Sequence, residues 1–211
     1  MTWGELLKQG QERLKKAGIQ EYELDAWYLF ERAFSMSRAR YFLDAKEEAA
    51  PGDEALKAYE DGLERRSGRV PLQHILGTQE FMGMEFFVNA HVLIPRQDTE
   101  TLVELVLQEQ KDKDISILDM CTGSGCIAVS LKKLGGYAHV EGADISEESL
   151  KVAKRNSEEI LENNDVNNDA VSSRTEQIQN CTNLTNNQNK QNNSAKRKIS
   201  EASKLSQAGV T

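Results

Sequence analysis

The chain has 211 residues, with 26 Lys plus Arg against 34 Asp plus Glu and a formal net charge of -8. This acidic balance excludes a protein whose whole surface binds nucleic acid, and we expect no direct nucleic-acid binding. No run approaches the roughly 18 apolar residues of a membrane span, and the amino terminus lacks a signal-peptide layout, so we expect a cytoplasmic protein. The three cysteines show no paired Cys-x-x-Cys spacing, so we predict neither disulfides nor a metal site.

The composition changes sharply along the chain. All thirteen aromatic residues lie between Trp3 and Tyr137, and all three prolines lie at or before Pro95. The 55 residues from Ser157 onward contain no aromatic residue, no proline and one glycine, and Asn, Gln, Ser and Thr dominate them. Such a composition cannot bury enough apolar surface to offset the chain entropy lost on folding. We therefore predict that residues 157–211 form a disordered polar tail.

The first residues are predicted to be helical. Thr2 and Glu5 have the spacing of a capping box and precede a helix that we expect to reach about Lys16. A bulky apolar stripe between Leu24 and Phe34, in a run without Gly or Pro, predicts a second amphipathic helix.

Two further helices are expected before the next break. Ser37 is a candidate cap for a short third helix, and Pro51 suits the first turn of a fourth. Arg65 and Arg66 lie near the end of that fourth helix, where cations are favoured. Residues 1–67 are therefore predicted to form a small helical bundle.

Gly68 and Pro71 then break the helical pattern. Residues 81–88 read as two short strands around a glycine turn, and the apolar run 92–94 extends this β pattern. We predict that residues 68–96 form a β-hairpin linker between two domains.

The next domain is expected to open with a helix capped by Asp98 or Thr99. Residues 115–131 read as a short apolar strand, a turn of small residues and an apolar helix, and residues 137–144 read as a second strand ending in an acid. With the helix that follows, this βαβα order predicts the start of a doubly wound α/β sheet over residues 97–156.

The turn after the first of these strands can hold a nucleoside. Gly123 and Gly125 let the backbone turn sharply and approach a ligand closely. The carboxylate of Asp144 can accept hydrogen bonds from ribose hydroxyls, and either Asp119 or the amides after it can face the polar end of the ligand. An acid there suits a cofactor with a sulfonium and an ammonium better than a pyrophosphate, whose charge it would repel.

An alternative stays open at this point. Gly123 and Gly125, followed by Ala128, also fit the dinucleotide fingerprint, and Asp144 falls about where that fingerprint expects its ribose acid. A nicotinamide-dependent oxidoreductase is therefore the second enzyme hypothesis, and a purely structural turn is a third interpretation. The position of Asp119 favours the methyl donor.

Four blocks of sequence between residues 68 and 125 occur in an order that is typical of one protein family. They are Gly-Arg-Val-Pro-Leu-Gln-His-Ile-Leu-Gly (68–77), Glu-Phe-Met-Gly (80–83), Val-Leu-Ile-Pro-Arg-Gln-Asp-Thr-Glu (92–100) and Ile-Leu-Asp-Met-Cys-Thr-Gly-Ser-Gly (117–125). Together they resemble the bacterial methyltransferases that modify the glutamine of the Gly-Gly-Gln loop in peptide chain release factors. The resemblance covers residues 1 to about 156. Two departures are Gln97 in place of a proline and Cys121 in place of the usual glycine.

The resemblance implies a class I, Rossmann-like methyltransferase domain with S-adenosyl-L-methionine as cofactor. The residues it assigns to the cofactor pocket are Asp119, Cys121, Thr122, Gly123, Ser124, Gly125 and Asp144. It also implies that the helical amino-terminal domain helps to bind the release factor, which is the expected partner. We interpret His74 and His91 as structural residues.

One motif of the family does not occur in this sequence. In the family, an Asn-Pro-Pro-Tyr motif accepts hydrogen bonds from the acceptor amide and so aims its nitrogen at the methyl group. The sequence has no proline after Pro95, so we name no catalytic residue. We expect a carboxyl-terminally incomplete and inactive member, produced by a frameshift, a truncation or a misassigned gene end. The non-enzyme alternative is a helical module that binds release factors without catalysis.

Overall fold

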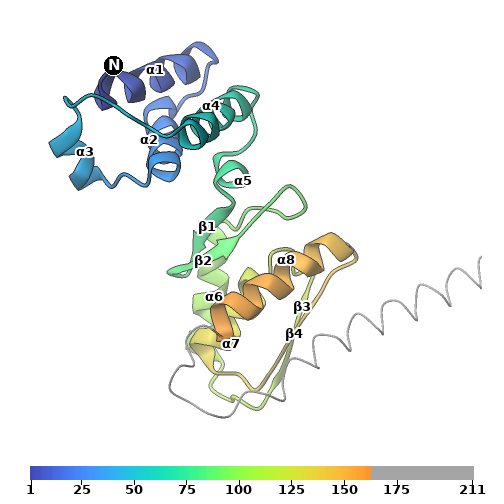
Figure 1. Cartoon of the computed structure of the whole chain (residues 1–211). Helices are drawn as coiled ribbons and strands as arrows, with labels where there is room; N and C mark the ends of the chain where they lie inside the picture. The colour runs from blue at the N-terminus through green and yellow to red at the C-terminus, as the bar shows by residue number, and fades with distance from the viewer. Residues whose placement is uncertain (163–211) are drawn as a thin grey trace, which may run out of the picture. The chain divides into compact units, whose positions relative to one another are not determined.

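The computed structural model describes residues 1–162 and divides the chain into two compact units (Figure 1). The first unit comprises Met1–Gln79 and Phe87–Ala90, and the described part of the second comprises Glu80–Phe86 and residues 91–162. Residues 163–211 of the predicted polar tail lie outside the described residues. No helix among residues 1–162 is both long enough and apolar enough to cross a membrane.

The first unit is helical, as the sequence predicts. Its helices are α1 (Trp3–Lys16), α2 (Tyr22–Phe34), α3 (Arg38–Asp44), α4 (Asp53–Ser67) and α5 (Leu72–Leu76). The capping box of α1 is present, because the Glu5 amide donates to the Thr2 hydroxyl and the Thr2 amide donates to the Glu5 carboxylate. The Ser37 hydroxyl accepts from the Arg40 amide and caps α3. The predicted role of Pro51 is wrong, because α4 begins two residues after it with Gly52 as its cap.

An aromatic and aliphatic core joins the helices of this unit. Leu14 of α1, Phe30 of α2 and Tyr59 of α4 are almost completely buried. The rings of Phe30 and Tyr59 meet edge to face with their centroids 5.8 Å apart. Burial of such side chains is the main favourable term for a small helical bundle.

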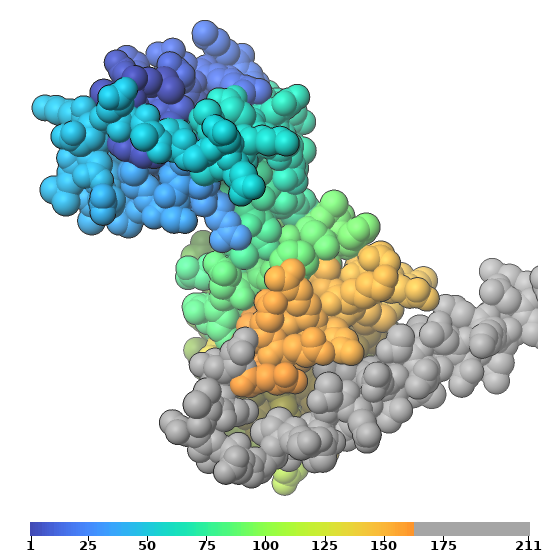
Figure 2. Space-filling view, viewed as in Figure 1, coloured from blue at the N-terminus to red at the C-terminus, as the bar shows by residue number. Residues whose placement is uncertain are grey.

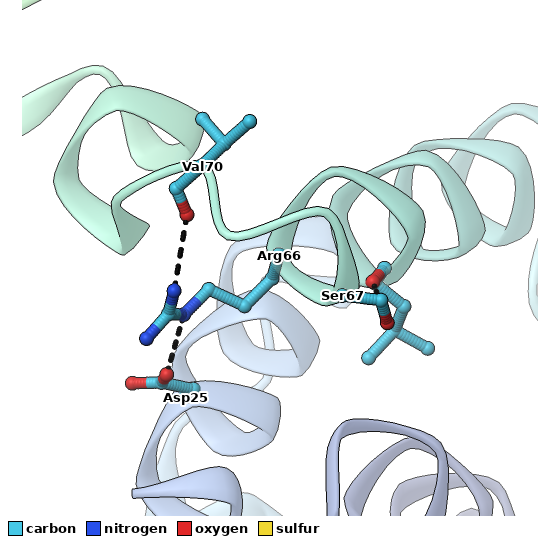
Figure 3. Close-up of polar contacts among 5 residues, drawn as sticks. Asp25, Arg66, Ser67 and Val70 are labelled. Atoms are coloured by element: carbon cyan, nitrogen blue, oxygen red, sulfur yellow. Dashed lines mark hydrogen bonds and ion pairs between the residues drawn. The ribbon is translucent and has the colours of Figure 1, made fainter. Parts of the chain in front are cut away.

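A partly buried ion pair fixes the end of α4 against α2 (Figure 3). Arg66 Nε donates to Asp25 Oδ2 at 2.6 Å, and another guanidinium nitrogen of Arg66 donates to the carbonyl of Val70 at 3.2 Å. The Asp25 side chain is 6% exposed and that of Arg66 is 20% exposed. Arg66 therefore holds both the helix end and the chain segment that leaves it.

The linker region differs from its prediction in two ways. Strands β1 (Thr78–Phe81) and β2 (Met84–Phe87) form the expected hairpin, but α5 precedes them and was not predicted. The apolar run 92–94 is not a strand. It has no strand partner among the described residues, and Val92 is buried whereas Leu93 is 72% exposed.

The hairpin turn is held from the following helix. Met82 and Gly83 both have positive φ, at 52° and 72°, as a two-residue turn between antiparallel strands requires. The Met82 amide donates to the Glu100 carboxylate at 2.6 Å. That carboxylate lies on α6 (Gln97–Glu109), whose cap is Arg96 rather than the predicted Asp98 or Thr99, and no side chain caps it. Asp98 instead lies in the first turn, where an acid interacts favourably with the helix dipole.

The second unit contains the predicted βαβα order. Its remaining elements are β3 (Ser116–Met120), α7 (Cys126–Gly135), β4 (His139–Ala143), α8 (Glu147–Ser157) and a π-helical turn, η1 (Glu158–Glu162). Strands β3 and β4 lie side by side and parallel, with Ser116 opposite His139 and Met120 opposite Ala143 (Figure 1). The start of a methyltransferase-like α/β domain is thereby confirmed.

The boundary of the predicted tail is corrected by η1. Residues 157–162 are helical, and Ile160 is only 8% exposed because it belongs to the core that includes Phe86, Val103 and Tyr137. Leu161 packs against the same core, so two apolar residues extend the folded part past Ser157. On the other face of β3, Leu118 and Met120 are 56% and 66% exposed.

Candidate cofactor site at the ends of β3 and β4

The candidate site lies where two parallel strands end. Strand β3 ends at Met120 and continues into residues 121–125, which we call the glycine loop, before α7 begins. Strand β4 ends at Ala143, which pairs with Met120, so that Asp144 follows at the same edge of the sheet. In open α/β sheets, ligands bind outside the carboxyl ends of the strands.

The glycine loop has an unusual backbone. Cys121, Gly123 and Gly125 have positive φ values of 64°, 57° and 80°, a region in which residues other than glycine are strained. At Gly125 space is limiting as well, because a Cβ there would lie 3.1 Å from the Cβ of Ala153 and 3.2 Å from its Cα. Helix α8 therefore packs directly on the loop, and only glycine satisfies both requirements at position 125.

Asp144 bonds directly to the glycine loop. Its Oδ2 accepts a hydrogen bond from the Gly123 amide at 2.9 Å, and its Oδ1 accepts one from the Ser146 amide at 2.9 Å. The carboxylate thus joins the loop to the start of α8. A carboxylate has about four lone-pair sites, so these two bonds leave capacity for a ligand hydroxyl.

Asp119 is held by Thr122. The Thr122 hydroxyl donates to Asp119 Oδ2 at 2.6 Å, and the Thr122 amide donates to the carbonyl of Ala143 at 2.9 Å. Thr122 is only 6% exposed, and its side chain packs on Gly142, where a Cβ would lie 2.9 Å from the Thr122 hydroxyl oxygen. Thr122 therefore contributes to the site by orienting the Asp119 carboxylate and joining the loop to β4.

The two cysteines near the loop differ in environment. Cys121 is exposed, whereas Cys126, the first residue of α7, is buried. Burial raises the pKa of the Cys126 thiol, although a hydrogen bond with the Ser124 side chain opposes the shift. Residues 1–162 contain no group of His, Cys, Asp and Glu side chains that could hold a metal ion.

The structure brings all seven predicted site residues into one group, and their role in cofactor binding stays a prediction. It also adds Asn156, which sequence reasoning missed. Asn156 lies on α8, is fully buried, and its side-chain amide donates to the carbonyl of Ser124 at 2.8 Å. The available signal was an asparagine on the apolar face of an amphipathic helix, where a polar side chain needs a specific partner.

Two family models match separate parts of the sequence. One, described as the PrmC N-terminal domain, matches residues 5–77. The other, described as ribosomal protein L11 methyltransferase (PrmA), matches residues 97–194. The first range falls on the helical unit, and the second begins at α6 and continues beyond the described residues.

Curated proteins match across both units. The release factor glutamine methyltransferase of Deinococcus radiodurans is 38% identical over 157 residues, which are 74% of this chain and 56% of that protein. The protein of the same name from Leptospira interrogans is 38% identical over 158 residues, 74% of this chain and 54% of its own length. The release factor glutamine methyltransferase of Geobacter sulfurreducens is 39% identical over 145 residues, which are 69% of this chain and 50% of that protein. The chain therefore spans about half the length of these relatives.

Proposed function

Because the chain belongs to the release factor glutamine methyltransferase family, we propose that the glycine loop and Asp144 bind S-adenosyl-L-methionine. The reaction we propose for the site is transfer of the cofactor's methyl group to the side-chain amide of the glutamine in the Gly-Gly-Gln motif of a peptide chain release factor. When bound, the cofactor supplies an electrophilic methyl group on a sulfonium.

The hydrogen bond between Asp144 and the Gly123 amide carries this proposal. It places an acid beside a tightly turned loop at the ends of two parallel strands, where a ribose can donate its hydroxyls to the carboxylate while the loop backbone lies against the nucleoside. Asp119 adds a second negative charge at the end of β3. Two carboxylates attract the sulfonium and ammonium of S-adenosylmethionine and repel a pyrophosphate, so the residues present fit the methyl donor better than a dinucleotide.

The acceptor side of the reaction is a separate proposal. An amide nitrogen is a weak nucleophile, because its lone pair is delocalised, and catalysis must come chiefly from positioning. The 211 residues contain no Asn-Pro-Pro-Tyr sequence. We therefore propose that this polypeptide binds the cofactor but does not by itself methylate a release factor. Residues 1–67, whose helices α1 to α4 share one core, are proposed to bind the release factor.

Calorimetry on the purified chain tests the cofactor assignment. We expect S-adenosylmethionine to bind and S-adenosylhomocysteine to compete for the same site, whereas NADH gives no heat of binding. NADH binding in the absence of S-adenosylmethionine binding would instead support the nicotinamide oxidoreductase. A methylation assay with a release factor tests the second proposal, and methylated glutamine formed by this chain would contradict it.

A further inference from the structure

Helix α8 carries two buried polar side chains on one face. Ser149 and Asn156 are seven residues apart, which is close to two helical turns, so they point in the same direction. Ser149 is 5% exposed and Asn156 is fully buried. Helix α8 is also exposed at the molecular surface (Figure 2), and its residues Lys151 and Glu148 form an exposed ion pair.

The two side chains make similar bonds to different parts of the unit. Ser149 Oγ donates to the carbonyl of His91 at 2.9 Å, in the segment before α6. Asn156 Nδ2 donates to the carbonyl of Ser124 at 2.8 Å, in the glycine loop. Both bonds therefore run from a buried donor on α8 to a backbone carbonyl, and only the second reaches the candidate site.

The bond from Asn156 fixes one particular peptide group. The carbonyl of the Ser124–Gly125 peptide accepts from Asn156, and the amide of the same peptide donates to the Thr122 carbonyl at 2.8 Å. Both polar groups of this peptide are thus held, from opposite sides. A peptide next to glycine rotates easily, because glycine populates positive and negative φ almost equally. Without Asn156, packing of Ala153 on Gly125 would remain, but nothing polar from α8 would oppose rotation of the carbonyl.

We propose that Asn156 is a positioning residue of the glycine loop, an inference that rests on the proposed cofactor site. By fixing the Ser124–Gly125 peptide, it restrains the glycine loop and so keeps the Gly123 amide, two peptide groups earlier in the chain, directed at the carboxylate that is proposed to hold the ribose. It does not contact the cofactor. Its contribution is to order the loop before the ligand arrives, so that the entropic cost of ordering is not subtracted from the binding free energy.

Asn156→Leu, in the full 211-residue chain, tests the inference, with Ser149→Ala as its matched control. Leucine has the same branched arrangement of side-chain heavy atoms as asparagine, although it is larger, and it has no donor. The control removes a comparable buried bond from the same helix face. Amide hydrogen exchange of Gly123 and Gly125 is measured without ligand, and the dissociation constant of S-adenosylhomocysteine is measured by calorimetry. We expect Asn156→Leu to accelerate exchange at both glycines and to weaken binding, each by about tenfold, the effect of one lost hydrogen bond. In the control, the exchange rates of the two glycines and the dissociation constant should stay within about twofold of the values for the unmodified chain.

The two measurements separate the inference from the proposed function. If the unmodified chain does not bind S-adenosylhomocysteine, the proposed function fails, whereas the exchange comparison still tests the role of Asn156. Equal acceleration by both variants, or unchanged exchange in Asn156→Leu, would overturn the inference. Should Asn156→Leu not fold, Asn156→Ser replaces it, because the shorter hydroxyl side chain cannot span the distance to the Ser124 carbonyl. Faster loop exchange in Asn156→Ser supports the inference, and exchange equal to that of the unmodified chain overturns it.

Discussion

Replacing Asp144 by asparagine separates its charge from its shape. The carboxylate accepts two backbone amides, one on each oxygen, whereas an asparagine side chain has one acceptor oxygen and an NH₂ group that would face the second amide donor to donor. One hydrogen bond to a charged group is therefore lost outright. Such bonds contribute about 1.5 to 3 kcal/mol, so we expect the free energy of unfolding to fall by about that amount.

The same substitution should weaken cofactor binding. The proposed ribose contact loses its negative charge, and one of the two backbone amides that Asp144 holds loses its acceptor, so we expect the dissociation constant of S-adenosylhomocysteine to rise between about tenfold and 100-fold. Calorimetry gives this constant, and urea denaturation gives the free energy of unfolding.

Asp112→Asn is the matched control for this experiment. The Asp112 carboxylate also accepts a backbone amide, from Asp114 at 3.0 Å, but it lies before the start of β3, at the opposite end of the strand from the glycine loop. This variant should leave the affinity unchanged. An Asp144→Asn protein that binds S-adenosylhomocysteine within about twofold of the unmodified chain, or a control that weakens binding equally, would refute the reasoning.

Two further predictions concern the helical unit and the thiols. Asp25→Ala leaves the guanidinium of Arg66 partly buried, with the Val70 carbonyl as its remaining acceptor in the helical unit. We expect the free energy of unfolding, measured by urea denaturation, to fall by about 2 to 4 kcal/mol, somewhat below the range for fully buried pairs. A fall of less than about 1 kcal/mol would show that the pair behaves as a surface ion pair. Because burial raises the pKa of Cys126 while Cys121 is exposed, iodoacetamide near neutral pH should modify Cys121 first and Cys126 only on unfolding, as read by mass spectrometry of peptides. If S-adenosylhomocysteine occupies the glycine loop, it should slow modification of Cys121, and equal rates with and without it would count against that position for the cofactor.

Features that depend on neighbouring residues could be predicted from the sequence. The capping box at Thr2 and the cap at Ser37 act over three residues, and the order of strands and helices from residue 115 onward follows from local periodicity. Local rules were wrong where a tertiary contact outweighed them. Among residues 1–162 the apolar run 92–94 has no strand to pair with, and Ile160 and Leu161 keep residues 157–162 folded because both pack in the core of the second unit.

The candidate site shows where sequence reasoning ends. The glycines and Asp144 could be identified as site residues because their chemistry is distinctive and the βαβ order places strand ends at one edge. The long-range contacts of the site could not, because they join residues far apart in the chain: 21 positions for Asp144 to Gly123 and 32 for Asn156 to Ser124. Such bonds exist only once the parallel register of β3 with β4 and the packing of α8 on the loop have been set. Residue type therefore determined which groups were available, and tertiary structure alone decided which of them meet.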